Sequence, residues 1–362
     1  MSVLYYPDCE YRTAITSTSD IRPKNRNIAY RGHDIQVLSQ RSTYEEVCYL
    51  LLFGALPDAG ELQDFSNNLA ESRELPAESG EIFKQRSPKA HLMDVLQTAM
   101  AFLGIVDPEA KDNSKKALLR KAVRTIAKLP TVIAASYRIS QRQEPISPMR
   151  QFGHARNFLY MLSGYGPDED AVTALDAVFI LYAERESGVS SLAARVAASS
   201  FTDYHSAITA EIGSLKRKQH GAANEEALRR LLEIKETGRA EEWIRLALAG
   251  KERIMGFGQG VHKQGDARAR IMKKLSKRLA DQMGDNGRHT LCEKIEEIML
   301  REKGLRCNLD LYAGQILHML GVPTGLCAPI FAAGRVAGWS AHIIAQIEKN
   351  RFISPPLRLS RP

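Results

Sequence analysis

The sequence lacks the features of a membrane-bound or exported protein. No apolar run approaches the ~20 residues that a membrane-spanning helix needs, and the chain starts without the basic segment and apolar core of a signal peptide. The cysteines are few, odd in number and irregularly spaced, and none forms a CxxC pair, which argues against a disulfide framework or a zinc site. They stand at Cys9, Cys48, Cys292, Cys307 and Cys327. These absences predict a cytoplasmic protein without a metal or a membrane segment.

Signs of nucleic-acid binding are also missing. The Lys and Arg residues are scattered instead of gathered in one arm, and neither zinc-finger spacing nor a basic strand with interleaved aromatics occurs. Basic residues nevertheless outnumber acidic ones, with a formal net charge of +8 and a pI of about 9.2. Such a surplus favours an anionic partner: nucleic acid, a membrane surface or a phosphate-rich cofactor. Of these, nucleic acid is the weaker choice.

What the chain does contain is the apolar content and periodicity of a helical globular protein. Of its 362 residues, 44% are hydrophobic and 25% charged, which fits one large domain or two unequal ones. Apolar residues recur at three- and four-residue spacings, while a βαβ rhythm and internal repeats are missing, so the predicted fold class is all-α. Helices are expected at 93–103, 119–139, 174–182, 192–212, 225–236, 240–249, 267–283, 291–303, 309–320 and 329–349.

Local signals refine this scheme. The first thirty residues are rich in turn formers and β-branched residues, which predicts a short irregular or β-like lead-in. Ser42–Glu45 has the pattern of a capping box, and Gly54 is expected to end the helix that follows it. Pro130 is expected to kink or break the helix at 119–139.

The charge distribution predicts two domains. The segment 217–310 is more charged than its flanks, which fits a smaller, mobile helical domain. The segments 1–216 and 311–362 are expected to form the larger helical domain. A cleft between two helical domains is a natural small-molecule site.

Four stretches carry residues with possible chemistry, beginning with His220. It lies in RKQHGAANEE at 217–226, where Asn224 is expected to cap the following helix and His220 to lie on the turn before it. Small neighbours allow a ligand close to the ring. An ordinary surface histidine beside a helix cap is the alternative.

The other three stretches contain a glycine-rich turn, an acidic residue at a helix start and an arginine within an apolar segment. Gly256–Lys263 reads GFGQGVHK, and glycine-rich turns bind phosphates through backbone N–H groups, although this one matches no nucleotide fingerprint. Asp310 opens an apolar helix, where a simple helix-terminal acid is the alternative. Arg335 lies in an apolar helix and therefore needs an internal anion, either a protein carboxylate or a ligand.

In this order the stretches resemble the citrate synthase family, and the resemblance covers nearly the whole chain. It rests on several motifs rather than one. They are Tyr30–Ile35, Glu45–Leu52, His91–Val95, Ala193–Val196, His220–Glu225, Gly256–Gly258 and Arg335–Trp339. The resemblance implies a two-domain, all-α homodimer in which the partner's C-terminal segment helps to close each site. It assigns the dimer contacts and the oxo-acid site to the larger domain, 1–216 and 311–362, and the acyl-CoA site to the smaller domain, 217–310.

The reaction implied is a Claisen-type condensation of an acyl-CoA, here acetyl-CoA, with a 2-oxo acid. A carboxylate removes a poorly acidic C–H proton, and a donor stabilises the oxyanion that forms. By the resemblance, Asp310 is the base and His220 the donor on the thioester oxygen, while Arg268 and Arg335 bind carboxylates. Lys263, with Gly256 and Gly258, is expected to contact CoA, which is a co-substrate; no permanently bound cofactor is expected.

The chain departs from the family on the acid side of this site. The family's L-H-A-D-H-E is LYAERE at 181–186, so Arg185 replaces a histidine that contacts the oxo acid. The family's G-F-G-H-R-V-Y-K places a histidine where this chain has Gln259, which donates a hydrogen bond but delivers no proton at neutral pH. The family's second-subunit arginine falls at Ser354.

Three functions remain open on this basis. The first is a condensing enzyme with an acceptor other than oxaloacetate, for example phosphonopyruvate, because the thioester half of the site is intact and the acid half is rebuilt. The second is an ordinary citrate or 2-methylcitrate synthase that tolerates these changes. The third is a non-catalytic paralogue that binds CoA in a regulatory or assembly role, since fold resemblance alone does not establish function.

Overall fold

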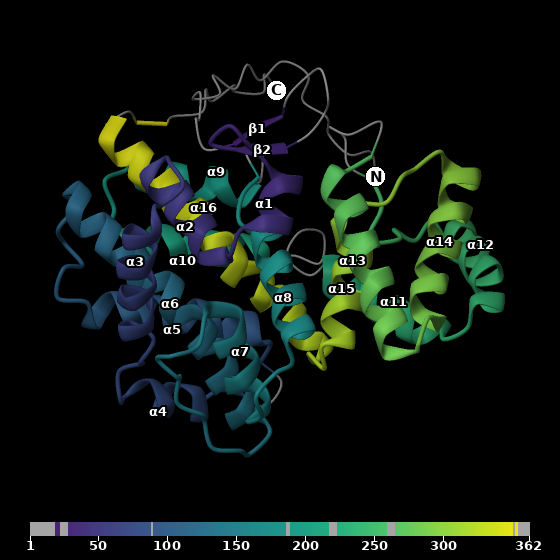
Figure 1. The fold of residues 1–362 in the computed structure, drawn as a ribbon, viewed down its shortest axis with the longest axis horizontal. Coiled ribbons are helices and arrows are strands. Elements are labelled where there is room, and N and C mark those ends of the chain that lie inside the picture. The colour runs from purple at the N-terminus through teal and green to yellow at the C-terminus, as the bar shows by residue number, and fades with distance from the viewer. Residues whose placement is uncertain are drawn as a thin grey trace, which may run out of the picture.

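The computed structural model describes residues 19–21, 28–87, 90–185, 189–216, 223–258, 265–349 and 352–353. Within these ranges the chain is mainly helical, as predicted, and the only sheet is small (Figure 1). The helices are α1 Ile35–Arg41, α2 Tyr44–Phe53, α3 Ala59–Glu71, α4 Ser79–Lys84, α5 Leu92–Val106, α6 Lys115–Ser140, α7 His154–Ser163, α8 Glu169–Tyr182, α9 Val189–Ser199, α10 Tyr204–Leu215, α11 Ala223–Ile234, α12 Ala240–Ala249, α13 Ala267–Met283, α14 Gly287–Lys303, α15 Leu309–Met319 and α16 Cys327–Lys349.

The β-like lead-in predicted for the first thirty residues is a three-stranded antiparallel sheet. Its strands are β1 Ser19–Ile21, β2 Ile28–Tyr30 and β3 His33–Asp34, in the order β1-β2-β3. The sheet lies next to α1 in Figure 1. No helix of the described residues is long and apolar enough to cross a membrane.

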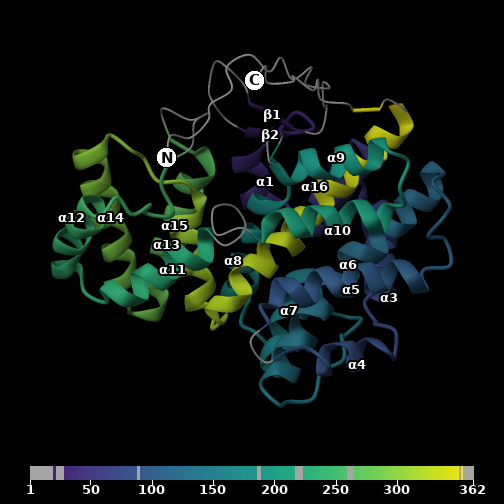
Figure 2. The same cartoon turned by 180° about the vertical axis from the view of Figure 1, so that it is seen from behind.

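Helix α16 is the centre of the larger group of helices. It packs against α2, α6, α8, α9 and α10 (Figures 1 and 2, yellow). Trp339 in this helix has no exposed surface. Two glycines bring α16 close to the end of α8: a Cβ atom at Gly334 would lie 2.9 Å from Cβ of Tyr182, and one at Gly338 would collide with the carbonyl oxygen of Ala183. This close approach places Arg335 beside the segment that follows α8.

Helices α11 to α14 form a second group on the other side of α8. Helix α15 packs mainly on α11 and α13, while α8 contacts both α13 and α15, and α1 also contacts α13. The division into a domain at 217–310 and a domain formed by 1–216 and 311–362 stays a prediction. The two groups of helices meet where α8 and α1 contact α13, where α8 contacts α15, and where α11 contacts α16.

Several predicted helix boundaries hold and others are wrong. The helices predicted at 240–249 and 267–283 have the bounds of α12 and α13. The single helix predicted at 192–212 is wrong, because α9 and α10 are separate, with Phe201 at a φ of +62° between them. The missed signal is Asp203, which caps α10 by accepting a hydrogen bond from the Ser206 backbone.

Two further local predictions need correction. The capping box at the start of α2 is one residue later than predicted, with Thr43 as the cap and Glu46 as its reciprocal partner. Gly54 ends this helix in the left-handed region, as predicted. Of the kink or break predicted at Pro130, the break does not occur, because α6 runs through this residue. The residues around Pro130 are buried, and this packing outweighs the one hydrogen bond that proline removes.

Candidate active site

The first turn of α15 holds the predicted base, Asp310. Asn308 caps the helix, and its side-chain oxygen accepts a hydrogen bond from the Asp310 backbone N–H at 2.9 Å. The Asp310 side chain keeps partial access to solvent. Burial among protein atoms nevertheless raises its pKa to about 6, against the charges of Arg268, Arg185 and Arg335, which act to lower it. The three arginines therefore lie close enough to share one electrostatic environment with this carboxylate.

Arg268 lies at the start of α13 and is fully buried. Asp266 caps this helix, because its Oδ1 accepts a hydrogen bond from the Arg268 backbone N–H. The Asp266 carboxylate also pairs with the Arg268 guanidinium: Oδ1 accepts from Nε at 3.1 Å, and Oδ2 accepts from Nη2 at 2.8 Å. The buried Nη1 has no hydrogen-bond partner among the described residues. A buried guanidinium N–H without a partner is costly, so this atom is available to a ligand anion.

Arg335 enters the same region from α16. Its Nε donates to the backbone carbonyl of Tyr182, and its guanidinium lies 4.8 Å from the ring centre of Phe331. Burial lowers the pKa of Arg335, while the charge of Glu184 opposes this shift. Glu184 is itself fully buried and lies 2.8 Å from Nε2 of His342.

Arg185 follows α8 and supplies the third cation. Burial lowers its pKa to about 10, and the neighbouring charge of Arg268 acts in the same direction. The side chain is therefore still protonated at neutral pH. The three arginines share this region with the carboxylates of Asp266, Asp310 and Glu184. Their planar guanidinium groups are suited to binding the carboxylates of an anionic substrate.

The glycine turn predicted to contact CoA lies against the same helix start. Gly256 and Gly258 have φ angles of +87° and +82°, which glycine adopts without strain. The Gly256 carbonyl accepts from the Asn308 backbone N–H at 2.9 Å, and a Cβ atom at Gly256 would lie 3.0 Å from Cβ of Leu311. The structure therefore brings Gly256, Arg185, Arg268 and Arg335 into the surroundings of Asp310.

The remaining predicted residues fall outside the described ranges. These are the donor His220, the acceptor-side Gln259, the CoA contact Lys263 and the divergent Ser354. Their roles stay predictions from sequence.

The prediction that Asn224 caps a helix is wrong. Helix α11 begins at Ala223, so Asn224 lies inside it, and its amide nitrogen donates to Oη of Tyr182 at 3.1 Å and to the Cys327 carbonyl at 2.9 Å. Burial raises the pKa of Tyr182, and the charge of Asp310 adds to this. Asn224 thus joins α11, α8 and α16 behind the base.

Sequence reasoning also missed Tyr182, Asp266, Glu184 and Glu211. Asp266 had a usable signal, since an Asp directly before an amphipathic run marks a helix cap. Glu211 had none, because α10 is apolar and only packing shows that its acid is buried. Neither carboxylate oxygen of Glu211 has a hydrogen-bond partner among the described residues. Burial raises its pKa, Glu184 raises it further, and Arg335 opposes both.

Comparisons with known proteins agree with this architecture. Residues 10–362 match the family model described as "Citrate synthase, C-terminal domain". The chain is 41% identical over 329 residues to "Citrate synthase 2" of Bacillus subtilis (strain 168), covering 91% of this chain and 88% of that one. It is 36% identical over 340 residues to "2-methylcitrate synthase" of Mycobacterium tuberculosis (strain H37Rv), covering 94% and 86%.

Solved structures agree as well. The ternary complex of carboxymethyl coenzyme A and oxaloacetate with citrate synthase from Thermoplasma acidophilum has a TM-score of 0.92 and 26% identity, covering 98% of this chain and 95% of that one. The citrate synthase from Pyrobaculum aerophilum has a TM-score of 0.88 and 35% identity, covering 96% and 90%.

The helical fold and these matches therefore define an enzyme of the type that condenses acetyl-CoA with an oxo acid. The chain belongs to the citrate synthase family.

Proposed function

We propose that the protein condenses acetyl-CoA with a 2-oxo acid other than oxaloacetate, with Asp310 as the general base. The observation that carries this proposal is the partly buried Asp310 carboxylate in the electrostatic environment of Arg185, Arg268 and Arg335. A pKa of about 6 keeps the carboxylate ionised at neutral pH while making it a stronger base than an ordinary aspartate. Proton removal from the acetyl methyl group gives an enolate that attacks the keto carbon, and hydrolysis of the thioester then releases CoA.

On the thioester side, the proposed roles rest on the sequence resemblance. His220 donates to the thioester oxygen as it gains charge. Gln259 donates to the keto oxygen of the acceptor, and Lys263 contacts the phosphates of CoA. Gly256 and Gly258 allow the backbone of that turn to approach the co-substrate.

On the acid side, the three arginines bind the acceptor. The free Nη1 of Arg268 supports a direct contact with a substrate anion, and Arg335 is held next to it by its bond to the Tyr182 carbonyl. Arg185 adds a permanent cation where the family pattern has a titratable ring. This extra charge supports an acceptor that is more highly charged than oxaloacetate, and phosphonopyruvate, with a phosphonate in place of one carboxylate, meets that requirement.

The second candidate function is that of an ordinary citrate or 2-methylcitrate synthase. The names of the relatives with 41% and 36% identity favour it. Arg185 and Gln259 would then be tolerated changes at an oxaloacetate site. The third candidate, a non-catalytic CoA-binding protein, gives no reason for a partly buried Asp310 carboxylate beside three arginines.

Proton removal is tested without knowledge of the acceptor. The purified protein is incubated in D₂O with acetyl-CoA or a stable thioether analogue, and deuterium entering the methyl group is followed by NMR. Asp310→Asn should slow this exchange by about 10²–10⁴-fold, the usual contribution of a general base. Asp94→Asn is the matched control, because Asp94 is also a first-turn acid, on α5. Absence of exchange in the unmodified protein would favour the non-catalytic candidate.

The acceptor is tested by the release of free CoA thiol with a panel of 2-oxo acids. Turnover with phosphonopyruvate should exceed turnover with oxaloacetate, and Arg185→His should reduce that preference by at least about tenfold, the effect of one charged contact. Arg245→His, an exposed site on α12, is the control. Clear turnover with oxaloacetate and none with phosphonopyruvate would reject this acceptor and leave the condensation itself intact.

We also propose that the active form is a homodimer. Leu192 and Val196 lie one turn apart on α9, and each is 41% exposed. Contiguous exposed apolar surface marks protein interfaces, and two such side chains one turn apart support an interface on this face of α9. Leu192→Glu with Val196→Glu should lower the mass measured by light scattering from two chains to one, and Leu246→Glu, at an exposed apolar site on α12, should leave it unchanged.

A further inference from the structure

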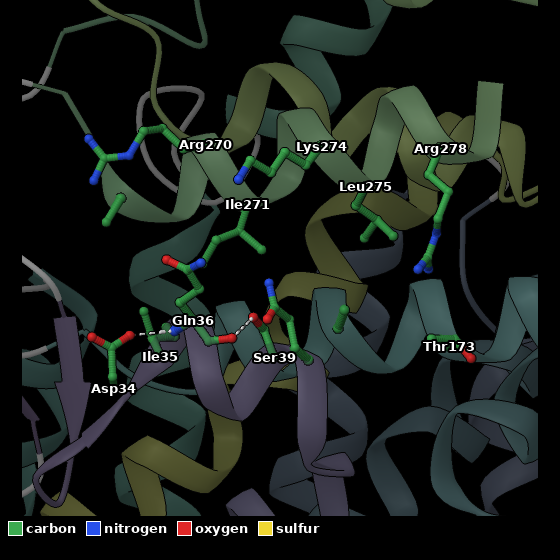
Figure 3. A pocket seen from close by; sticks show the side chains of 13 residues that line it. Asp34, Ile35, Gln36, Ser39, Thr173, Arg270, Ile271, Lys274, Leu275 and Arg278 are labelled. Atoms are coloured by element: carbon green, nitrogen blue, oxygen red, sulfur yellow. Dashed lines mark hydrogen bonds between the residues drawn. The ribbon is translucent and has the colours of Figure 1, made fainter. Parts of the chain in front are cut away.

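A groove with a cavity volume of about 410 Å³ lies where α13 meets α1 and α8 (Figure 3). Its size is within the range of small-molecule sites, about 300–1,000 Å³. It is lined by Asp34, Ile35, Gln36, Ser39, Gln40, Thr173, Ala177, Ala267, Arg270, Ile271, Lys274, Leu275 and Arg278. We call this surface the basic groove, because its α13 side carries Arg270, Lys274 and Arg278.

Three cations of α13 line the basic groove in a row. Arg270, Lys274 and Arg278 are each four positions apart, so their Cα atoms follow one another at about 6 Å along one face of the helix. All three are exposed, and Figure 3 shows their side chains along the α13 side of the groove. Within the described part of the chain, none of them has an ion pair or a hydrogen bond.

The other lysines of the same helix behave differently. Lys273 pairs with Glu296 at 2.9 Å and with Glu293 at 3.2 Å. Lys277 pairs with Asp281, one turn further along the helix. The helix therefore neutralises its cations on the other faces and leaves charge unbalanced only along the groove. Three like charges in a row repel one another, and an anion bound between them removes that cost.

The opposite wall supplies neutral polar groups. Gln36, Ser39 and Gln40 come from α1, and Thr173 comes from α8. The one carboxylate in the lining, Asp34, is engaged as the cap of α1, where it accepts from the Gln36 backbone N–H at 2.8 Å. Amide and hydroxyl groups facing a row of cations complete the donor set that phosphate oxygens require.

We propose that the basic groove binds a small anion of the polyphosphate class, extended along α13. A chain of phosphates carries several charges in a line, as the row of Arg270, Lys274 and Arg278 does. The described lining contains no aromatic side chain on which a base would stack, so recognition is by the phosphates alone. Inorganic polyphosphate and the phosphate tail of a nucleotide share this chemistry.

This site is distinct from the acid-binding site. Arg268 lies two positions before Arg270, about 200° away around the helix, and is buried toward Asp310 while Arg270 faces the groove. An anion in the basic groove contacts α13 on one side and α1 and α8 on the other. It therefore ties together the two groups of helices at one of the places where they meet, and it stabilises the folded protein by mass action.

The test is calorimetric titration of the full chain with inorganic tripolyphosphate. One ion should bind per chain, with an affinity that falls as salt rises. The triple variant Arg270→Gln, Lys274→Gln, Arg278→Gln should bind at least tenfold more weakly, by about the loss expected for charged contacts, and Arg278→Gln alone should show part of the loss. Lys277→Gln, which removes a paired cation of the same helix, should bind as the unmodified protein does.

Further arms of the titration separate the remaining explanations. ATP should bind with about the affinity of tripolyphosphate; much tighter binding of ATP would contradict recognition by phosphates alone. Saturating CoA should leave tripolyphosphate binding unchanged, and displacement by CoA would overturn the separate site. Equal tripolyphosphate binding by the triple variant and the unmodified protein would overturn the proposal that these three cations form the site. Circular dichroism confirms folding of each variant, and none of these readouts depends on the proposed condensation.

Discussion

The buried acid of α10 offers a quantitative test of the site's electrostatics. Glu211 has no exposed surface, and its two carboxylate oxygens lack partners in the described part of the chain. Burial is the main reason that its pKa lies well above the ordinary value, and the negative charge of Glu184 adds to the effect. Glu211 is therefore protonated in the folded protein over a pH range in which the unfolded chain ionises it.

The sign of the effect on stability follows from proton binding. Above the unfolded pKa of 4.5, the folded state holds a proton at Glu211 that the unfolded state has lost, so the free energy of unfolding falls as pH rises toward the folded pKa. The maximum slope is about 1.4 kcal/mol per pH unit. Glu211→Gln removes this slope, because an amide does not ionise. Glu211→Leu also removes a buried polar group without partners, worth about 1–3 kcal/mol.

The measurement is urea unfolding at several pH values between 4.5 and 8. The difference in unfolding free energy between Glu211→Gln and the unmodified protein should be smallest near pH 4.5 and grow as pH rises. The unfolding free energy of Glu211→Leu should exceed that of the unmodified protein across this pH range. Glu81→Gln, at an exposed acid of α4 that pairs with Lys84, is the control and should give parallel curves. Parallel curves for Glu211→Gln would refute the reasoning, because Glu211 would then be ionised in both states.

Three more predictions concern the site itself. Methyl exchange should fall about tenfold per pH unit below pH 6, where Asp310 is protonated, and a profile flat down to pH 4.5 would contradict its role as base. Asp266→Asn should lower the unfolding free energy by about 3–5 kcal/mol, because it leaves the Arg268 charge buried without its partner; an unchanged urea midpoint would contradict this. Gly338→Ala should cost about 1–3 kcal/mol through its collision with the Ala183 carbonyl, and a melting temperature equal to that of the unmodified protein would show that α16 has room to shift.

Local features of the fold could be predicted because their causes lie within a few residues. The bounds of α12 and α13 follow from apolar periodicity and caps. The position of Asp310 in a first turn follows from Asn308 before it. Packing decides the outcome where it competes with a local signal. Pro130 does not break its helix, because the residues directly before and after it are buried.

The charges of the site were only partly predictable. The apolar sequence around Arg335 was enough to indicate an internal anion, and motif order alone assigned Arg185 and Arg268 to the same site. The sequence contained no sign that Asn224 would bind Tyr182 across two helices, or that Glu211 would be buried without a partner. The roles of His220, Gln259 and Lys263 stay predictions.

The chain alone thus specified the all-α class, most of the longer helices and the types of side chain available for the chemistry, because periodicity, caps and composition act over short distances. Tertiary packing decided which distant charges meet. The close approach of α16 to the end of α8 brings Arg335 to the carbonyl of Tyr182, and burial there raises the pKa of Asp310 to about 6. Desolvation depends on every atom around a group, so no local pattern contains it.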